Sequence, residues 1–166
     1  MDAVPFHPAL VHVPLGLAIV LPFVGFGVLL ASRRQWLPFR TWGVVLFLQV
    51  VTTASGVLAM RTGEAEEELL EGQIPDEALE RHEELAEQFV WAMAASTALG
   101  AGALLLQATP AGPWLALAST TGTGAAVGLG IRAGASGGEL VYRHGAADAR
   151  RIPATDRQSN PNGHED

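Results

Sequence analysis

Four long stretches of this sequence contain no Asp, Glu, Lys or Arg, and they constrain the fold more than any other feature. They cover residues 11–31, 41–60, 88–111 and 112–131. Each stretch has about the 20 residues that a helix needs to cross a hydrocarbon core of about 30 Å. Helices of a water-soluble bundle would instead carry a polar stripe along their outer face. The sequence therefore predicts an integral membrane protein with four transmembrane helices.

The spacing of these stretches predicts an all-α, integral membrane four-helix bundle with up-down connections. The bundle accounts for residues 1–147, and its spans are expected at about residues 11–31, 41–60, 88–108 and 113–132. The remaining residues, 148–166, are polar, contain prolines and predict a disordered tail. Four alternating spans place the N-terminus, the loop between the second and third spans, and the C-terminus on one side of the membrane.

An acidic extramembrane segment, residues 61–87, joins the second and third spans. A short solvated helix is expected to begin after Gly63, where several glutamates follow in close succession. Farther along, Ala78, His82 and Phe89 recur at helical spacing among acidic residues. This pattern predicts that the third helix extends beyond the membrane as an amphipathic segment. After the fourth span, adjacent glycines at 137–138 predict a turn.

The residue types present limit the chemistry. The 166 residues include five His and no Cys. A thioether-attached haem and a thiolate-held iron–sulfur cluster are thereby excluded, so a cofactor must be held by His, Met, Tyr or carboxylates. The sequence contains neither a recognisable Ser-His-Asp nucleophile pattern nor a phosphate-binding glycine loop. It therefore favours a chain that is not an enzyme by itself and indicates no nucleic-acid partner.

The histidines all fall on the side of the membrane that carries the termini. His7 and His12 precede or enter the first span, His82 lies on the apolar stripe ahead of the third, and His144 follows the fourth, while His164 belongs to the tail. Polar groups at the mouth of an apolar span are costly unless they find a partner. The histidines either form local structural hydrogen bonds or build a cofactor site, and their shared side favours the site.

A b-type haem is the first cofactor that these residues predict. Its axial ligands would come from His12 and His82, since neutral imidazole binds haem iron. Further residues on the same side would add a ligand or pair with the propionates: His7, His144, Arg61 and Arg143. Space for the macrocycle is expected beside glycines of the spans, namely Gly16, Gly100, Gly124 and Gly128.

A single transition-metal ion is the alternative cofactor. Its ligands would be His12, His82, Glu64 and Glu83, with carboxylates binding directly or orienting the imidazole rings. The concentrated negative charge of the acidic segment would attract cations. A metal-ion transporter built on this chain would require oligomerisation, because a four-helix monomer leaves little room for a pathway.

Four motifs resemble one known family. They are HPALVHVP at residues 7–14, TGE at 62–64, HEE at 82–84 and GGELVYRHG at 137–145. In this order they resemble domain of unknown function 2231, a family of bacterial membrane proteins, over roughly residues 6–147. Some members are joined to Rieske-type iron–sulfur domains, which implies by association that the fold works beside electron-transfer components. The resemblance implies no established activity, and it places His7, His12, His82 and His144 within motifs.

Three functions remain open from the sequence. The chain would be a haem-binding electron-transfer subunit, a non-catalytic accessory or structural subunit of a larger membrane redox or photosynthetic complex, or a metal-ion binding or transport protein. The expected partners are the lipid bilayer and either other membrane subunits or further copies of the chain. The expected host is the bacterial cytoplasmic (inner) membrane. Arginines at 33–40 place the first hairpin loop inside, so the histidine side is expected to be periplasmic, although Arg150 and Arg151 argue the opposite.

Overall fold

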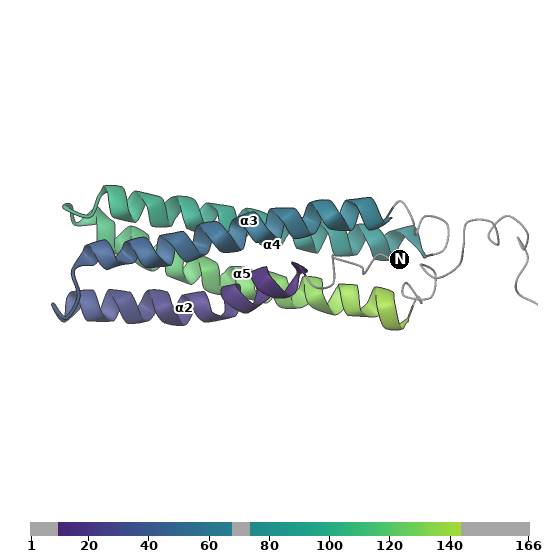
Figure 1. Ribbon diagram of the computed structural model, residues 1–166, viewed down its shortest axis with the longest axis horizontal. Coiled ribbons are helices and arrows are strands. Elements are labelled where there is room, and N and C mark those ends of the chain that lie inside the picture. The colour runs from purple at the N-terminus through teal and green to yellow at the C-terminus, as the bar shows by residue number, and fades with distance from the viewer. Residues whose placement is uncertain (1–9, 68–73, 144–166) are drawn as a thin grey trace, which may run out of the picture.

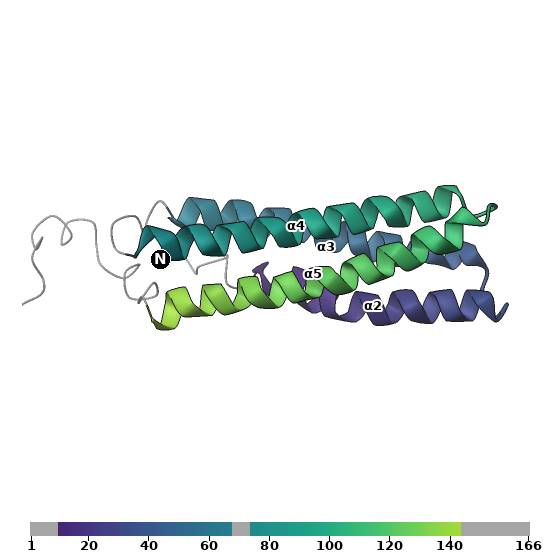
Figure 2. The ribbon, with the colours of Figure 1, turned by 180° about the vertical axis from the view of Figure 1, so that it is seen from behind.

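Four long helices make up the protein. The computed structural model describes residues 10–67 and 74–143, without the side chains of 64–67. Its elements are α2 (His12–Arg33), the short 3-10 helix η1 (Phe39–Thr41), α3 (Trp42–Glu67), α4 (Asp76–Leu105) and α5 (Ala111–Tyr142). The long helices lie side by side and alternate in direction, so that α2 begins and α5 ends toward the same end of the bundle (Figures 1 and 2). The expected all-α four-helix bundle is confirmed.

The outer surface of the bundle is apolar. All four long helices are long and apolar enough to cross a bilayer. Large side chains point away from the interior, with Phe23 76% exposed and Phe47 65% exposed, whereas Gln49 and Thr52 are buried inside. Apolar surface of this extent would be unfavourable in water and is favourable against lipid. This distribution is that of a multi-pass membrane protein.

Two helices continue where the sequence predicted an interruption. The short helix expected after Gly63 does not begin separately there, because α3 runs through Gly63 to Glu67, and residues 68–73 of the expected helix lie outside the described part of the chain. No turn forms at residues 137–138, because α5 runs through them to Tyr142. Glycine inside a helix costs only about 1 kcal/mol relative to alanine, and tertiary contacts such as that between Gly137 and His82 offset such a cost.

The third helix ends earlier than expected, at Leu105 and not at residue 108. Residues that follow form the tight connection to α5, and Gly112 in the first turn of α5 lies close to the backbone of this connection. A Cβ atom on Gly112 would lie 2.8 Å from the carbonyl oxygen of Leu106. Pro110 immediately precedes α5, and a proline disfavours helical backbone in the residue before it. These two residues explain why the helix does not extend through the whole apolar run.

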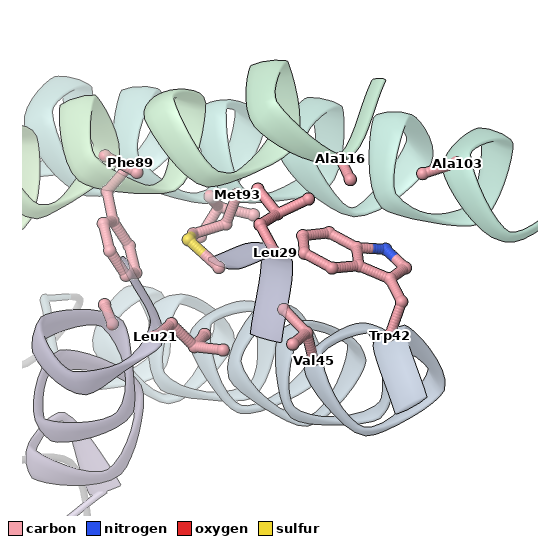
Figure 3. Close-up of a cluster of buried hydrophobic side chains, with 11 residues drawn as sticks. Leu21, Leu29, Trp42, Val45, Phe89, Met93, Ala103 and Ala116 are labelled. Carbon is pink, nitrogen blue, oxygen red and sulfur yellow. The ribbon is translucent and has the colours of Figure 1, made fainter. Parts of the chain in front are cut away.

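Side chains from all four helices fill the centre of the bundle. Leu21 and Leu29 of α2 meet Trp42 and Val45 of α3, and residues of α4 and α5 close the other side (Figure 3). Trp42 is 0% exposed, and its indole Nε1 donates a hydrogen bond of 3.0 Å to the carbonyl oxygen of Gly100. The membrane-spanning part therefore has a solid, side-chain-packed core.

A second, smaller apolar cluster lies beyond this core. Ile74 and Leu79 at the start of α4 pack with Leu140 near the end of α5. At this end of the molecule α3, α4 and α5 extend past the start of α2 (Figure 1). The end of the bundle that holds His12 and His82, called the histidine end below, is thus built from three long helices, with the first turn of α2 beside them.

Candidate functional site

His82 interrupts the inward-facing apolar stripe of α4. Leu79, Leu85 and Phe89 on this stripe are buried, and His82 between them is half-buried. Its ring nitrogen Nδ1 lies 3.1 Å from the carbonyl oxygen of Ala133 and 3.0 Å from the hydroxyl oxygen of Ser136, both on α5. The ring therefore joins α4 to α5 between the small apolar cluster and the main core.

These contacts favour a proton on one nitrogen of the ring. A carbonyl oxygen only accepts hydrogen bonds, so the contact with Ala133 is a hydrogen bond when Nδ1 of His82 carries the proton. The Ser136 hydroxyl donates to the same carbonyl at 2.8 Å, which leaves its oxygen able to accept from Nδ1. In the neutral ring, a proton on Nδ1 leaves the lone pair on Nε2. In this tautomer Nε2 thus carries the lone pair that a metal ligand needs.

Gly137 makes room for the ring. A Cβ atom at this position would lie 3.0 Å from Cε1 of His82 and 3.5 Å from Nδ1. The imidazole consequently packs against the backbone of α5, and a larger residue at 137 would push it away from Ala133. One of the two glycines that predicted a turn, Gly137, instead makes room for the imidazole ring of His82.

His12 is exposed at the first turn of α2. A common level for the helices is given by Gly130 of α5, because Leu15 and Phe89 both lie within 3.2 Å of its Cβ position. His12 precedes Leu15 by three residues and His82 precedes Phe89 by seven. At 1.5 Å per residue, the two histidines lie about 4.5 Å and about 10 Å beyond that level, in the same direction. Both histidines therefore lie beyond the Gly130 level, toward the same end of the bundle.

Within the part of the chain that the structure describes, the other predicted site residues are not gathered around His82. Arg61 and Glu83 are exposed, and Arg143 is exposed and forms an ion pair of 2.7 Å with Glu139, one turn earlier. Residues 7 and 144 and the side chain of Glu64 lie outside the described part of the chain. Among the described residues, no three His, Asp or Glu side chains are close enough to hold a metal ion. The predicted four-ligand metal site is not assembled within this part of the protein.

The glycines expected to make room for a haem do not line a common space. At Gly16, Gly124 and Gly128 no described atom outside the local helix lies within 4 Å of the Cβ position, and all three residues are exposed. At Gly100 the corresponding space is filled by Gln49 and Ser119. These glycines therefore do not provide space for a haem macrocycle in the membrane-spanning core.

A layer of hydrogen-bonded polar side chains crosses the core, and the sequence analysis missed it. Gln49 of α3 is 1% exposed, and its Nε2 donates to the hydroxyls of Ser119 at 2.8 Å and Thr123 at 3.0 Å. Ser119 in turn donates to the carbonyl oxygen of Ser96 at 2.7 Å. Hydrogen bonds of this kind hold transmembrane helices together. The signal was a single amide within the second span and a hydroxyl-rich run in the fourth.

Gly100→Ala is expected to destabilise the bundle by about 1–2 kcal/mol, because the new methyl group would stand 2.5 Å from Gln49 Oε1 and force the amide from its two partners. In a Gln49→Ala background the same substitution should cost much less. The check is a double-mutant cycle on unfolding free energies in mixed micelles. Gly102→Ala on the same helix meets only an ordinary contact of 3.5 Å and serves as the control. Strict additivity of the two substitutions would contradict this account.

The comparisons with known proteins leave the family open. No family model, curated protein or solved structure matches the chain. The resemblance of its motifs to domain of unknown function 2231 therefore stays a prediction.

Proposed function

We propose that the chain is a membrane-embedded electron-transfer subunit that binds a b-type haem at the histidine end, with Nε2 of His82 as an axial ligand. The observation that carries the proposal is the hydrogen bond from Nδ1 of His82 to the carbonyl oxygen of Ala133. Histidines that bind metals almost always donate their other ring N–H to a carbonyl, carboxylate or water, which orients the ring and raises its basicity. The haem would supply one-electron exchange.

The packing of the core side chains supports a place for the haem outside the membrane-spanning core. The membrane-spanning core is filled by Trp42, Met93 and the Gln49 layer, so a macrocycle would lie beyond that core. At that level α2 has only just begun, while its neighbours continue past it. His12 on the first turn of α2 would provide the second ligand. Arginines near this end, Arg61 and Arg143, are exposed and would pair with propionates, with His7 and His144 as further candidate ligands.

The proposal also names the membrane, the side on which the histidine end lies and the class of partner. α2 and α4 begin and α3 and α5 end toward the histidine end, and we place this end on the periplasmic side of a bacterial cytoplasmic membrane. The resemblance of the motifs to domain of unknown function 2231 supports an electron-transfer setting, because some members of that family are joined to Rieske-type domains. Partners would then be other redox subunits of the membrane.

The test is a reduced-minus-oxidised absorption spectrum of detergent-purified full-length protein, with Fe, Cu and Zn analysis on the same sample. A sharp reduced α band with about one iron per chain is the expected result. Stoichiometric copper or zinc without a band would favour the single-ion alternative. If neither metal nor band is found, and added haem does not bind, the electron-transfer proposal is wrong.

An accessory or structural subunit is the second candidate. The outer face of α5 favours it, because Gly124 and Gly128 stand four residues apart and are exposed, with no described atom outside their own helix within 4 Å of their Cβ positions. Small residues at this spacing allow a second transmembrane helix to approach closely. In that function His82 would serve only to join α4 to α5, and the purified protein would show no haem spectrum.

A further inference from the structure

Ser136 stands behind the ring of His82 and has no role in the functions considered so far. It is 8% exposed and lies on α5, one turn after Ala133. Its oxygen is 3.0 Å from Nδ1 of His82, and its hydroxyl donates to the Ala133 carbonyl at 2.8 Å. Three polar atoms from two helices therefore form a closed triangle on one edge of the imidazole.

We propose that Ser136 is a positioning residue: together with the Ala133 carbonyl, its oxygen holds His82 in the tautomer protonated on Nδ1 and directs Nε2 toward the bound haem. The last clause rests on the proposed function, whereas the choice of tautomer does not. Ser136 acts only through His82 and does not touch the iron.

The chemistry of the triangle favours one tautomer. With the proton on Nδ1, the ring donates to two oxygens, and the Ser136 proton is satisfied by Ala133. With the proton on Nε2, the lone pair of Nδ1 would face the Ala133 carbonyl oxygen at 3.1 Å, and the Ser136 hydroxyl would have to turn away from that carbonyl. A histidine ring in water has no such constraint. Removing the Ser136 oxygen leaves Nδ1 facing the Ala133 carbonyl and holds the ring less tightly.

Ser136 also affects the strength of the ligand. Acceptors on the N–H of a ligand imidazole increase its basicity, and loss of such an outer partner typically weakens metal binding about 10- to 100-fold. A less basic ligand stabilises oxidised iron less than a more basic one does. Ser136→Ala is therefore expected to weaken haem binding about tenfold and to raise the midpoint potential.

The first arm of the test needs no haem. Full-length protein labelled with ¹⁵N in histidine is studied by NMR in micelles at a pH where the rings are neutral, and the His82 signals are identified by their loss in His82→Gln. The wild type is expected to carry its proton on Nδ1. Ser136→Ala should raise the population protonated on Nε2, and Ser136→Thr, which keeps the hydroxyl, should restore the wild-type pattern. A wild-type ring protonated on Nε2 would overturn the assignment, whatever the haem does.

The second arm measures haem affinity and midpoint potential in the same variants, with helix content followed by circular dichroism. Ser55→Ala is the matched control, because the Ser55 hydroxyl makes the same bond to a carbonyl three residues earlier, at 3.0 Å to Thr52, on a different helix. Unchanged affinity and potential in a folded Ser136→Ala protein would overturn the positioning role. If the wild type binds no haem while its ring is protonated on Nδ1, the proposed function fails and the tautomer assignment stands.

Discussion

His82→Ala is expected to abolish haem binding, with loss of the reduced α band and of the bound iron. The substitution removes the ligand nitrogen together with the two hydrogen bonds that hold the ring against α5. His12→Ala should also abolish binding, because it removes the opposite ligand. The measurement is a haem titration of each purified variant, followed by its reduced-minus-oxidised spectrum.

The control for both histidine variants is His164→Ala, in the polar tail, which should leave the spectrum unchanged. Thermal melting of the haem-free proteins separates loss of a ligand from loss of the fold. His82→Ala should lower the melting temperature by a few degrees, because it removes the two contacts of the ring with α5. Haem binding that survives in both variants would eliminate the proposed site.

Trp42→Ala is expected to cause the largest loss of stability, about 3–5 kcal/mol. The indole ring is 0% exposed and packs within the main core, beside Leu29 and Val45 (Figure 3). Its removal leaves a cavity between helices and deletes the hydrogen bond to the Gly100 carbonyl. The change in unfolding free energy is measured by titrating micelle-bound protein with a denaturing detergent and following the loss of helix.

Trp42→Phe separates the two contributions, because it keeps most of the packing and should cost about 1 kcal/mol for the hydrogen bond alone. Trp114→Ala is the matched control. Trp114 is 66% exposed and lies in the first turn of α5, so its truncation creates no internal cavity. Equal destabilisation by Trp42→Ala and Trp114→Ala would show that Trp42 is not central to the core.

The helical architecture could be predicted because a bilayer imposes one requirement on every span. Each charge-free run had to form a helix to satisfy its backbone hydrogen bonds in lipid. Where helices end outside the lipid is decided by other interactions, which the composition does not report. Gly63 and Gly137 looked like helix breakers, yet α3 and α5 pass through both. Conversely, α4 ends at Leu105 although apolar residues continue.

The candidate site was predictable only in part. His82 could be found because a polar residue stood on an apolar helical stripe. Its partners could not, because Ser136 and Ala133 look like ordinary small residues, and their contact with His82 depends on how α4 and α5 are aligned. The same reason hid the Gln49 layer, whose members come from three helices. The prediction that glycines would make room for a haem failed because the sequence did not show which face of each helix points inward.

The hydrogen bonds of Gln49 have a consequence for biosynthesis. Both acceptors of its amide belong to α5, the last of the four helices to leave the ribosome. When α3 enters the bilayer, this amide has none of the partners that it has in the finished bundle. Its transfer into lipid therefore costs free energy that is offset only when α5 arrives. A nascent chain cut short before α5 should therefore be a substrate for membrane quality-control proteases.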